Sequence, residues 1–383
     1  MDFAFSPEER KFKQEVDQFL IGEKETVIEA RKELDSGTGF GSYVWDLLRK
    51  LGSRGWLCPT WPKEYGGLDL PHIYRYILTE EIDYYIGNLI TVGAGMAGPV
   101  VLARGSDQQK NEYLPRIARG EIDFALGYTE PQAGSDVASL EIRAEDKGDY
   151  FLMNGQKMFN TRCHYAQYHW LGARTRVTEK KHQGISLFIV DFKTPGISLS
   201  PLWTVGGMRT NQVFYDNVQV PKDCLVGEAN RGFYYIMEAL DYERIFPSSG
   251  IRRDFQELVD YVKRIGKGKD PLVRQKLAEL AIDIECANLF ALRTAWILNN
   301  KRIPTYEPGI GKILRTETEH RLANTALQIF GHYGQLNKDS KWASLDGLFE
   351  WKYRDTLEYI IAGGTSEILR NVTAQRGLGL PRG

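Results

Sequence analysis

The chain has 383 residues, of which 42% are hydrophobic and 26% charged, and its 49 Lys+Arg residues nearly balance its 50 Asp+Glu residues. This length exceeds one ordinary hydrophobic core, and the composition is that of a folded globular protein, which excludes long disordered stretches. Because the formal net charge is only -1, no overall field would hold nucleic acid, and we expect no nucleic-acid partner.

The opening residues predict a helix. Ser6 stands at the N-cap, Pro7 at the first helical position and Glu9 three residues after the cap, which is a capping-box pattern. The pattern stays helical to about residue 121, and we expect an N-terminal helical domain over residues 1–122. Apolar residues recur at helical spacing at Phe12, Val16, Phe19 and Leu20.

An uncharged run over residues 84–103 contains four glycines and Pro99. These residues favour a buried helix over a membrane span, and we expect no membrane insertion. Within the run, GAGMAG at 93–98 matches GxGxxG. Since Pro99 follows at once and helical patterns surround the motif, close helix packing through small residues is preferred to a dinucleotide-binding βαβ unit.

The hydrophobic period changes after Ile122, which predicts a β domain over residues 123–231. Asn154-Gly155 is a strong two-residue hairpin signal between two apolar runs. Further β-rich stretches span 185–192 and 212–220.

Helical spacing returns from Gly232, and residues 232–383 are expected to form a C-terminal helical domain with a long helix over 272–299. The order α, β, α predicts an α+β fold. The stripe that opens this domain comprises Phe233, Ile236, Met237 and Leu240.

The polar segment GYTEPQAGSD, residues 127–136, offers hydroxyls and backbone amides to a cofactor or its phosphates. Its TEPxAGSD core resembles the flavin-contacting loop of the acyl-CoA dehydrogenase family. Other segments resemble signatures of that family in the same order: WPKEYGG, NGQKMFNT, VGGMRTNQVFYDNVQVP, ALDYER, QIFGHYG and YRDTLEYIIAGGTSEILRN.

This resemblance covers nearly the whole chain and implies a fold, a cofactor and a reaction. The fold would be an N-terminal helical domain, a small central β-barrel-like domain and a C-terminal four-helix bundle. The cofactor would be FAD, and the substrate an acyl-CoA thioester oxidised at its α,β bond. An electron-transferring flavoprotein would be the acceptor, and the assembly a homotetramer or heterotetramer.

The resemblance also implies roles for single residues in the flavin site. Thr129 would hydrogen-bond the isoalloxazine edge, Ser135 would lie near the flavin and the pantetheine arm, and Thr161 near the reactive N5 edge. Phe159 stands where many relatives have a tryptophan, and it keeps an aromatic face for the flavin. The implied cofactor-binding set is Leu126, Tyr128, Thr129, Ser135, Phe159, Thr161, Gln328, Gly331, Thr365 and Glu367.

Many relatives place the catalytic carboxylate directly before the GT of the last signature, where this chain has Gly363. A branch resembling isovaleryl-type and long-chain-type enzymes places its base on the first helix after the β domain, in a motif matched here by LDYER. Glu243 is therefore the expected base, and it extends the apolar face three residues beyond Leu240. The alternative is a surface glutamate paired with a nearby Lys or Arg.

Gly363 could still contribute its backbone N–H to the thioester carbonyl, and its missing Cβ could widen the acyl pocket for a bulky group. Asp241 and Arg244 would face the CoA moiety by resemblance, together with Ser135, although an ordinary helix ion pair is an alternative for the first two.

Two departures from the family pattern concern the half of the FAD site shared with a neighbouring subunit. The usual RxxFG-like segment is replaced at 263–276 by KRIGKGKDPLVRQK, and a glycine pair by Gly331-His332. A heteromeric enzyme with fewer complete FAD sites, a non-catalytic partner subunit and an oxidase therefore stay open as alternatives.

The cysteines and histidines indicate neither a metal site nor disulfides. Cys58, Cys163, Cys224 and Cys286 form no CxxC pair, and the six histidines lack metal-ligand spacing. The first residues lack the apolar core of a signal peptide, and we expect a cytoplasmic location.

Overall fold

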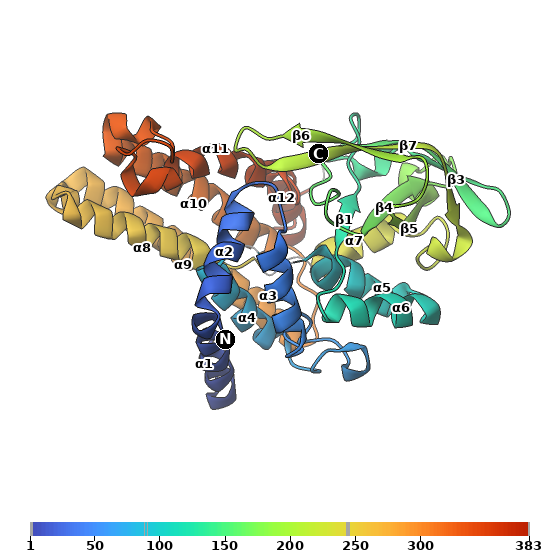
Figure 1. Cartoon of the computed structure of the whole chain (residues 1–383), viewed down its shortest axis with the longest axis horizontal. Helices are drawn as coiled ribbons and strands as arrows, with labels where there is room; N and C mark the ends of the chain where they lie inside the picture. Colours follow the sequence, from blue (N-terminus) through green and yellow to red (C-terminus); the bar gives the residue numbers. More distant parts are fainter. Residues whose placement is uncertain (1–2, 88, 90, 243–245, 382–383) are drawn as a thin grey trace.

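The computed structural model of the chain describes residues 3–87, 89, 91–242 and 246–381. Figure 1 shows a β-sheet domain at one end of the long axis, a bundle of long helices at the other, and the N-terminal helices between them. The predicted α+β fold, with helical domains before and after a central sheet, is confirmed.

The N-terminal region is helical, as its apolar spacing predicts. The predicted capping box is present, because the Ser6 hydroxyl accepts from Glu9 N at 3.1 Å and the Glu9 carboxylate accepts from Ser6 N at 2.7 Å. The helices are α1 (Pro7–Gly22), α2 (Lys24–Asp35), α3 (Ser42–Gly52), α4 (His72–Tyr85), α5 (Gly98–Arg104) and α6 (Asp107–Ala118).

The run 84–103 is not the single buried helix that its composition suggests. Helix α4 ends at Tyr85, and a π-helical turn over Gly93–Ala97 leads into α5. Small residues allow close packing here, as expected, because a Cβ on Gly98 would lie 2.2 Å from the Trp61 ring. Among the described residues, no helix is long and apolar enough to cross a membrane.

The central domain is a seven-stranded mixed sheet with the order β1-β4-β2-β3-β7-β6, and β5 pairs with β4. The pairs β1·β4 and β2·β4 are parallel, and the other pairs are antiparallel. The strands are β1 (Phe124–Gly127), β2 (Arg143–Asp146), β3 (Tyr150–Lys157), β4 (Tyr168–Arg174), β5 (Ile185–Asp191), β6 (Ile197–Trp203) and β7 (Arg209–Pro221).

The predicted hairpin turn at Asn154-Gly155 is wrong. Both residues lie inside β3, where the register against β7 shifts between Met153 and Gly155. The φ of Gly155 is 142°, and the Asn154 side chain accepts from Asn217 N at 2.8 Å on the neighbouring strand. The flexible pair therefore forms a β-bulge, because strands β2 and β7 flank β3 on both sides and supply its partners.

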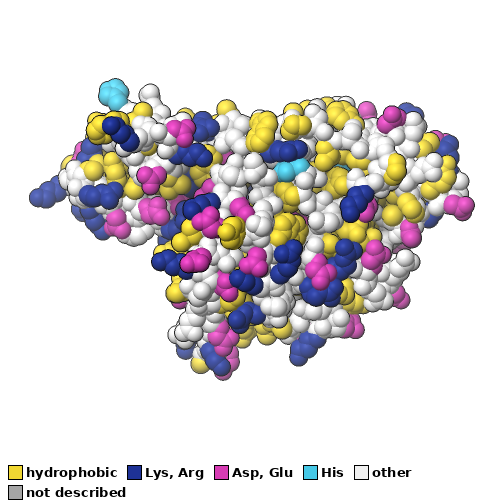
Figure 2. Space-filling view, viewed as in Figure 1, with side chains coloured by type: hydrophobic (Ala, Val, Ile, Leu, Met, Phe, Trp, Pro, Cys, Tyr) yellow, Lys and Arg dark blue, Asp and Glu magenta, His cyan; other side chains and the backbone are white. Residues whose placement is uncertain are grey.

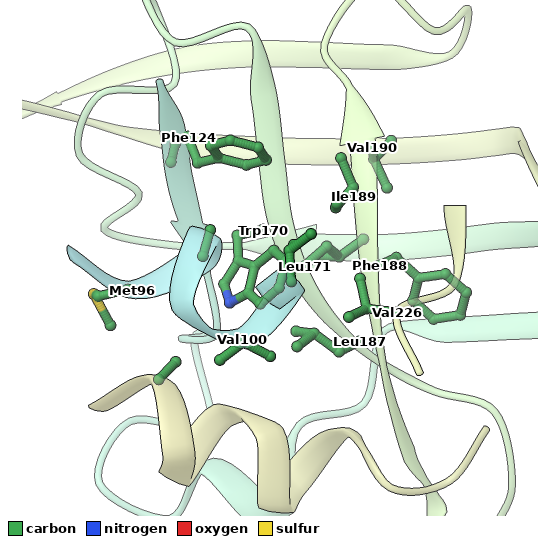
Figure 3. Close-up of a cluster of buried hydrophobic side chains, with 14 of the residues drawn as sticks. Met96, Val100, Phe124, Trp170, Leu171, Leu187, Phe188, Ile189, Val190 and Val226 are labelled. Carbon is green, nitrogen blue, oxygen red and sulfur yellow. The ribbon is translucent and has the colours of Figure 1, made fainter. Parts of the chain in front are cut away.

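The core of the β domain is formed with helices from both flanking domains. Trp170 on β4 is fully buried, and Figure 3 shows its indole beside Met96 and Val100 of the π turn and α5. Helix α7 (Gly232–Tyr242) joins the same core with the buried residues Ile236 and Ala239. The β domain thus packs directly on α7, the helix that precedes the expected base in the chain.

The C-terminal region is built from long helices that follow α7. The buried faces of α8, α9, α10 and α11 share one core cluster, as four helices of a bundle would. Figure 2 shows acidic and basic side chains interspersed over one face of the molecule. The helices are α8 (Ser249–Arg264), α9 (Pro271–Asn299), α10 (Glu307–Phe330), α11 (Leu348–Ile361) and α12 (Ser366–Val372).

Candidate active site

The loop after β1, which contains the TEPxAGSD core, is held by one buried carboxylate. Glu130 is 3% exposed, and its oxygens accept from Glu141 N at 2.6 Å, from Ile142 N at 3.0 Å and from Lys157 Nζ at 2.8 Å. Gln132 Nε2 also donates to it at 2.9 Å, and a carboxylate with four donors is well compensated for its burial. The loop therefore has a fixed shape without any ligand.

Lys157, at the end of β3, ties this loop to the neighbouring strand. Its ammonium group donates to Tyr128 O at 3.1 Å as well as to Glu130. Burial lowers the pKa of Lys157 to about 8, against the attraction of Glu130. One residue on, Met158 N donates to Thr129 O at 2.9 Å. The expected flavin residues 129 and 159 therefore lie on adjacent, hydrogen-bonded segments.

Phe159 has an unusual backbone and an exposed ring. Its φ is 56°, which is rare for an aromatic residue, and 61% of its surface is exposed. The next residue holds this conformation, because Asn160 N donates to Asn211 O at 2.9 Å and Asn211 Nδ2 donates to Asn160 O at 3.0 Å. Backbone strain of this kind concentrates at functional sites and is retained when the surroundings fix it.

These residues fit an isoalloxazine ring. An exposed aromatic face at Phe159 can pack against a flavin. The half-buried Thr161 lies two residues further along the chain, and the half-buried Thr129 lies on the segment that is hydrogen-bonded to Met158, so both could offer hydroxyl groups to its polar edge. Ser135 is exposed at the tip of the loop. The other two expected residues are the half-buried Leu126 and the buried Tyr128, whose ring lies in the β-domain core.

The C-terminal signature contributes a sharp turn. Gly363 and Gly364 have φ values of 65° and 94°, in the region that favours glycine, and a Cβ on Gly363 would meet no atom of the described residues within 4 Å. The buried Lys312 donates to Gly364 O at 2.9 Å. Thr365 is the N-cap of α12, where its hydroxyl accepts a backbone N–H, and Glu367 is exposed in the first turn. The open space at Gly363 can admit a ligand.

The β domain contacts the helix that leads into this turn. The loop between β6 and β7 presents two carbonyls to α11: Trp351 Nε1 donates to Gly206 O at 3.1 Å, and Arg354 Nη1 donates to Val205 O at 2.8 Å. Strand β7, which begins at Arg209, carries the Asn211 that fixes the backbone beside Phe159. The two halves of the expected flavin site are thus linked through β7 and α11.

The expected base Glu243 lies outside the described residues, as does Arg244, and Asp241 is the last but one residue of α7 with its side chain also outside the description. The predicted apolar stripe is confirmed up to that point: Ile236 is fully buried, and Phe233, Met237 and Leu240 pack partly buried against the core. The residues that carry the base therefore follow a helix whose position is set by packing.

A small, partly open pocket of about 50 Å³ is formed mainly by α4 and the segments before and after it. Pro247, four residues after Glu243, forms part of its wall. The wall is mostly apolar but contains two charged residues, Arg75 and Asp83 of α4. The full lining is Leu51, Trp56, Leu57, Arg75, Leu78, Thr79, Ile82, Asp83, Gly87, Leu89, Thr91, Ala94, Gly95 and Pro247.

Buried charges of α4 and α10 were missed by the sequence analysis. Glu80, Asp83 and Arg315 hydrogen-bond the backbone of residues 247–250. Burial, with repulsion from Asp83, raises the pKa of Glu80 to about 7. The sequence does show Glu80 and Asp83 three residues apart among the apolar residues of α4, which could have indicated two buried acids. It does not show which groups they would bond.

Two expected cofactor residues are far from the others within one chain. Gln328 and Gly331 are exposed at the C-terminal end of α10, whereas Lys312, which contacts the Gly364 turn, lies near its start. Sixteen residues of helix separate Gln328 from Lys312, which is about 24 Å at the helical rise. A single chain therefore does not bring all the expected FAD residues together.

Several basic residues of the segment 263–276 bond to groups of the same chain. Lys267 Nζ donates to Ile329 O at 2.6 Å, and Lys276 donates to the side chain of Gln328. Lys263 pairs with Asp260 at 3.2 Å. Within the part of the chain that the structure describes, no group of His, Cys, Asp and Glu side chains has the arrangement of a metal site.

Three family models match the chain in succession. They are the acyl-CoA dehydrogenase N-terminal domain over residues 6–121, the middle domain over 125–218 and the C-terminal domain over 230–378. Together they cover nearly the whole chain, and their order is that of the three structural regions described above.

Individual proteins agree with this match. The acyl-CoA dehydrogenase FadE29 of Mycobacterium tuberculosis is 34% identical over 100% of this chain and 99% of its own. The solved structure of the Tcur3481-Tcur3483 steroid ACAD has a TM-score of 0.92 at 33% identity, with 100% of both chains covered. The ChsE4-ChsE5 complex from Mycobacterium tuberculosis has a TM-score of 0.88 at 29% identity, again over 100% of both chains. The chain therefore belongs to the acyl-CoA dehydrogenase family, a family of FAD-dependent oxidoreductases.

Proposed function

We propose that this enzyme oxidises the α,β bond of an acyl-CoA thioester, with Glu243 as the base that removes the α-proton. The observation that carries this proposal is the position of the flanking chain: α7 packs against the β-domain core, and Pro247 lines the small pocket. The proposal requires the Glu243 carboxylate to be partly desolvated, which would strengthen it as a base.

FAD, when bound, accepts the hydride that leaves the β-carbon. Phe159 would cover one face of its ring, with Thr129 and Thr161 at the polar edge. Leu126, Tyr128, Ser135, Thr365 and Glu367 are proposed as further FAD contacts within the same chain.

The protein must also stabilise the negative charge that develops on the thioester oxygen. The Gly363 backbone N–H is proposed as a donor, since among the described residues no atom lies within 4 Å of where a Cβ on Gly363 would be. Asp241, Arg244 and Ser135 are proposed to bind the CoA moiety. The space at Gly363 favours a branched, cyclic or otherwise bulky acyl group, and one similar structure is that of a steroid ACAD.

Anaerobic titration of the purified yellow holoenzyme with a panel of acyl-CoAs tests the reaction, the cofactor and the substrate together. We expect flavin absorbance to bleach and the matching enoyl-CoA to form, most completely with a bulky acyl group. If no acyl-CoA of any chain length or shape bleaches the flavin, the proposed reaction is wrong. Reoxidation by an electron-transferring flavoprotein, without release of peroxide, would support that acceptor over an oxidase.

A second proposal concerns assembly: this chain is a subunit of a heteromeric enzyme with incomplete FAD sites. It is supported by the use of Lys267 and Lys276 within their own chain, which leaves fewer cations for a neighbour's FAD phosphates. One similar structure is a complex of two proteins, ChsE4 and ChsE5. Gln328 and Gly331 would then contact the FAD of a neighbouring subunit.

Flavin per chain decides between the assemblies. A homotetramer with complete sites predicts one FAD per chain in protein purified alone. A heteromer predicts substoichiometric FAD that rises when the partner chain is co-expressed, and a non-catalytic partner subunit predicts that substitution of Glu243 leaves the activity of that complex unchanged.

A further inference from the structure

The residues that follow the proposed base Glu243 are held by two buried side chains from distant helices. Arg315 of α10 donates from Nε to Pro247 O at 2.7 Å. Glu80 of α4 accepts from Ser248 N through Oε1 at 2.9 Å. Consecutive residues, four and five positions after the base, are therefore fixed by two different helices.

Asp83, one helical turn after Glu80 on α4, also bonds the backbone that follows the proposed base. Its Oδ2 accepts from Gly250 N at 2.6 Å, and its Oδ1 lies 3.9 Å from Arg315 Nη2. The Ser249 hydroxyl donates to Glu80 O. A Cβ on Gly250 would lie 2.9 Å from the Asp83 carboxylate, so the approach of the two helices leaves little room for movement.

Removing these charged side chains from water costs free energy. Glu80 is 6% exposed, Asp83 is 2% exposed, and the side chain of Arg315 is 13% exposed. Charged residues at such depth are rare unless they are paired or hydrogen-bonded. Two of them bond the first turn of α8, where a carboxylate also interacts favourably with the helix dipole. Part of their contribution is therefore to the stability of α8.

We propose that Glu80 and Arg315 are positioning residues for the catalytic base, in addition to stabilising α8. The proposal rests on the proposed function of Glu243. Through Pro247 and Ser248 they fix the end of the short segment that carries the base, and the end of α7 fixes its beginning. A general base must stay within hydrogen-bond reach of its proton, and a displacement of about 1 Å can lower a rate on the order of a hundredfold.

The test compares Glu80→Met with Glu80→Gln in the purified holoenzyme. Met removes the acceptor for Ser248 N at similar volume, whereas Gln keeps an acceptor oxygen and loses only the charge. We expect Glu80→Met to slow flavin reduction at saturating acyl-CoA about tenfold, with a larger primary isotope effect from α-deuterated substrate, and Glu80→Gln to retain most of the rate. Glu80 is not among the residues proposed to contact FAD or the CoA moiety, so the Kd for acyl-CoA should change little.

The matched control is Glu81→Met, one residue further along α4. Glu81 is similarly buried, at 9% exposed, but it pairs with Lys13 of α1 instead of the 247–250 backbone. The control should lose stability without slowing flavin reduction. A readout independent of activity is amide hydrogen exchange, which should become faster at Ser248 in Glu80→Met and stay unchanged there in Glu81→Met.

A rate for folded Glu80→Met equal to that of the control overturns the positioning role. If Glu80→Met does not fold, Arg315→Lys replaces it, because lysine keeps the positive charge beside Asp83 and Glu319 but lacks the guanidinium Nε–H that donates to Pro247 O; an unchanged rate and isotope effect again overturn the proposal. Glu243→Gln separates the two hypotheses. If it reduces flavin normally, the proposed base is wrong whatever the Glu80 result, and if it alone abolishes reduction, only the positioning role fails.

Discussion

At the scale of single residues, the site depends on charges buried far from solvent. The pair Lys157 and Glu130 joins the loop at 128–136 to the end of β3, two residues before Phe159, and neither side chain is more than 2% exposed. A charge at this depth is tolerated only because its partner is present. The proposed flavin-binding surface is therefore held in place by residues that are not themselves proposed to contact the flavin.

Glu130→Ala should lower the free energy of unfolding by about 3–5 kcal/mol, because it leaves the Lys157 ammonium buried without its counter-charge. Urea denaturation of the purified protein measures this loss. The control is Glu145→Ala, which removes an exposed ion pair with Lys147 and should cost at most about 1 kcal/mol. Equal losses in the two variants would contradict the role given to the buried pair.

A second residue-scale prediction concerns His169, which is fully buried and bonds Tyr215 OH through Nδ1 at 2.7 Å. Burial, aided by the charge of Lys157, lowers the pKa of His169 to about 3. Below about pH 6.5 the unfolded chain binds a proton that the folded chain does not, so stability falls as the pH falls through this range.

Between pH 7 and pH 5 this residue should account for about 2 kcal/mol of lost stability. Unfolding of His169→Gln should therefore depend less on pH than unfolding of the unmodified enzyme by about that amount. Substitution of the exposed His332 by Gln should leave the pH dependence as it was. A variant at 169 with the full original dependence would show that another group is responsible.

At the scale of elements, the contact between the β6–β7 loop and α11 joins the β domain to the turn at Gly363. Gly206 has no room for a side chain, because a Cβ would lie 2.5 Å from Asp355 Cα. The loop carbonyls at Val205 and Gly206 accept from α11 side chains. Separation of these two elements should therefore disturb both halves of the flavin site.

Gly206→Ala should destabilise the protein by about 1–3 kcal/mol through overpacking and should lower the flavin retained per chain. Thermal unfolding and the flavin absorbance of gel-filtered protein measure the two effects. Gly22→Ala is the control, since a Cβ there meets no atom within 4 Å and the φ is not positive. Full flavin retention in Gly206→Ala would show that this contact does not support the site.

The elements also show what a sequence can predict. The capping box at Ser6 and the long helix now seen over Pro271–Asn299 are encoded by local pattern, and both were predicted. The bulge at Asn154-Gly155 was mistaken for a hairpin turn, because its outcome depends on β2 and β7, which are supplied from elsewhere in the chain. The sequence therefore indicated an irregular backbone at this pair, but it did not show whether the strand would turn back or continue through a bulge.

At the scale of the whole molecule, the candidate site is assembled from all three regions of the chain. Thr129 and Phe159 were found through resemblance, and the structure brings their segments together by a hydrogen bond. The contact of Glu80 with Ser248 joins residues 168 positions apart, and no periodicity or motif reports such a pairing. The supporting residues of the site thus follow from the tertiary fold, whereas the residues proposed to face the flavin follow from short signatures.

The proposed reaction depends on removal of the substrate's α-proton by the carboxylate of Glu243. The most direct measurement is the rate of anaerobic flavin reduction by a good acyl-CoA in Glu243→Gln, compared with the unmodified enzyme and with Glu238→Gln, a control on α7 whose partner is Arg104. With flavin content unchanged, the account predicts a loss on the order of a hundredfold or more for Glu243→Gln and none for the control. Flavin reduction in Glu243→Gln at the rate of the unmodified enzyme would contradict it.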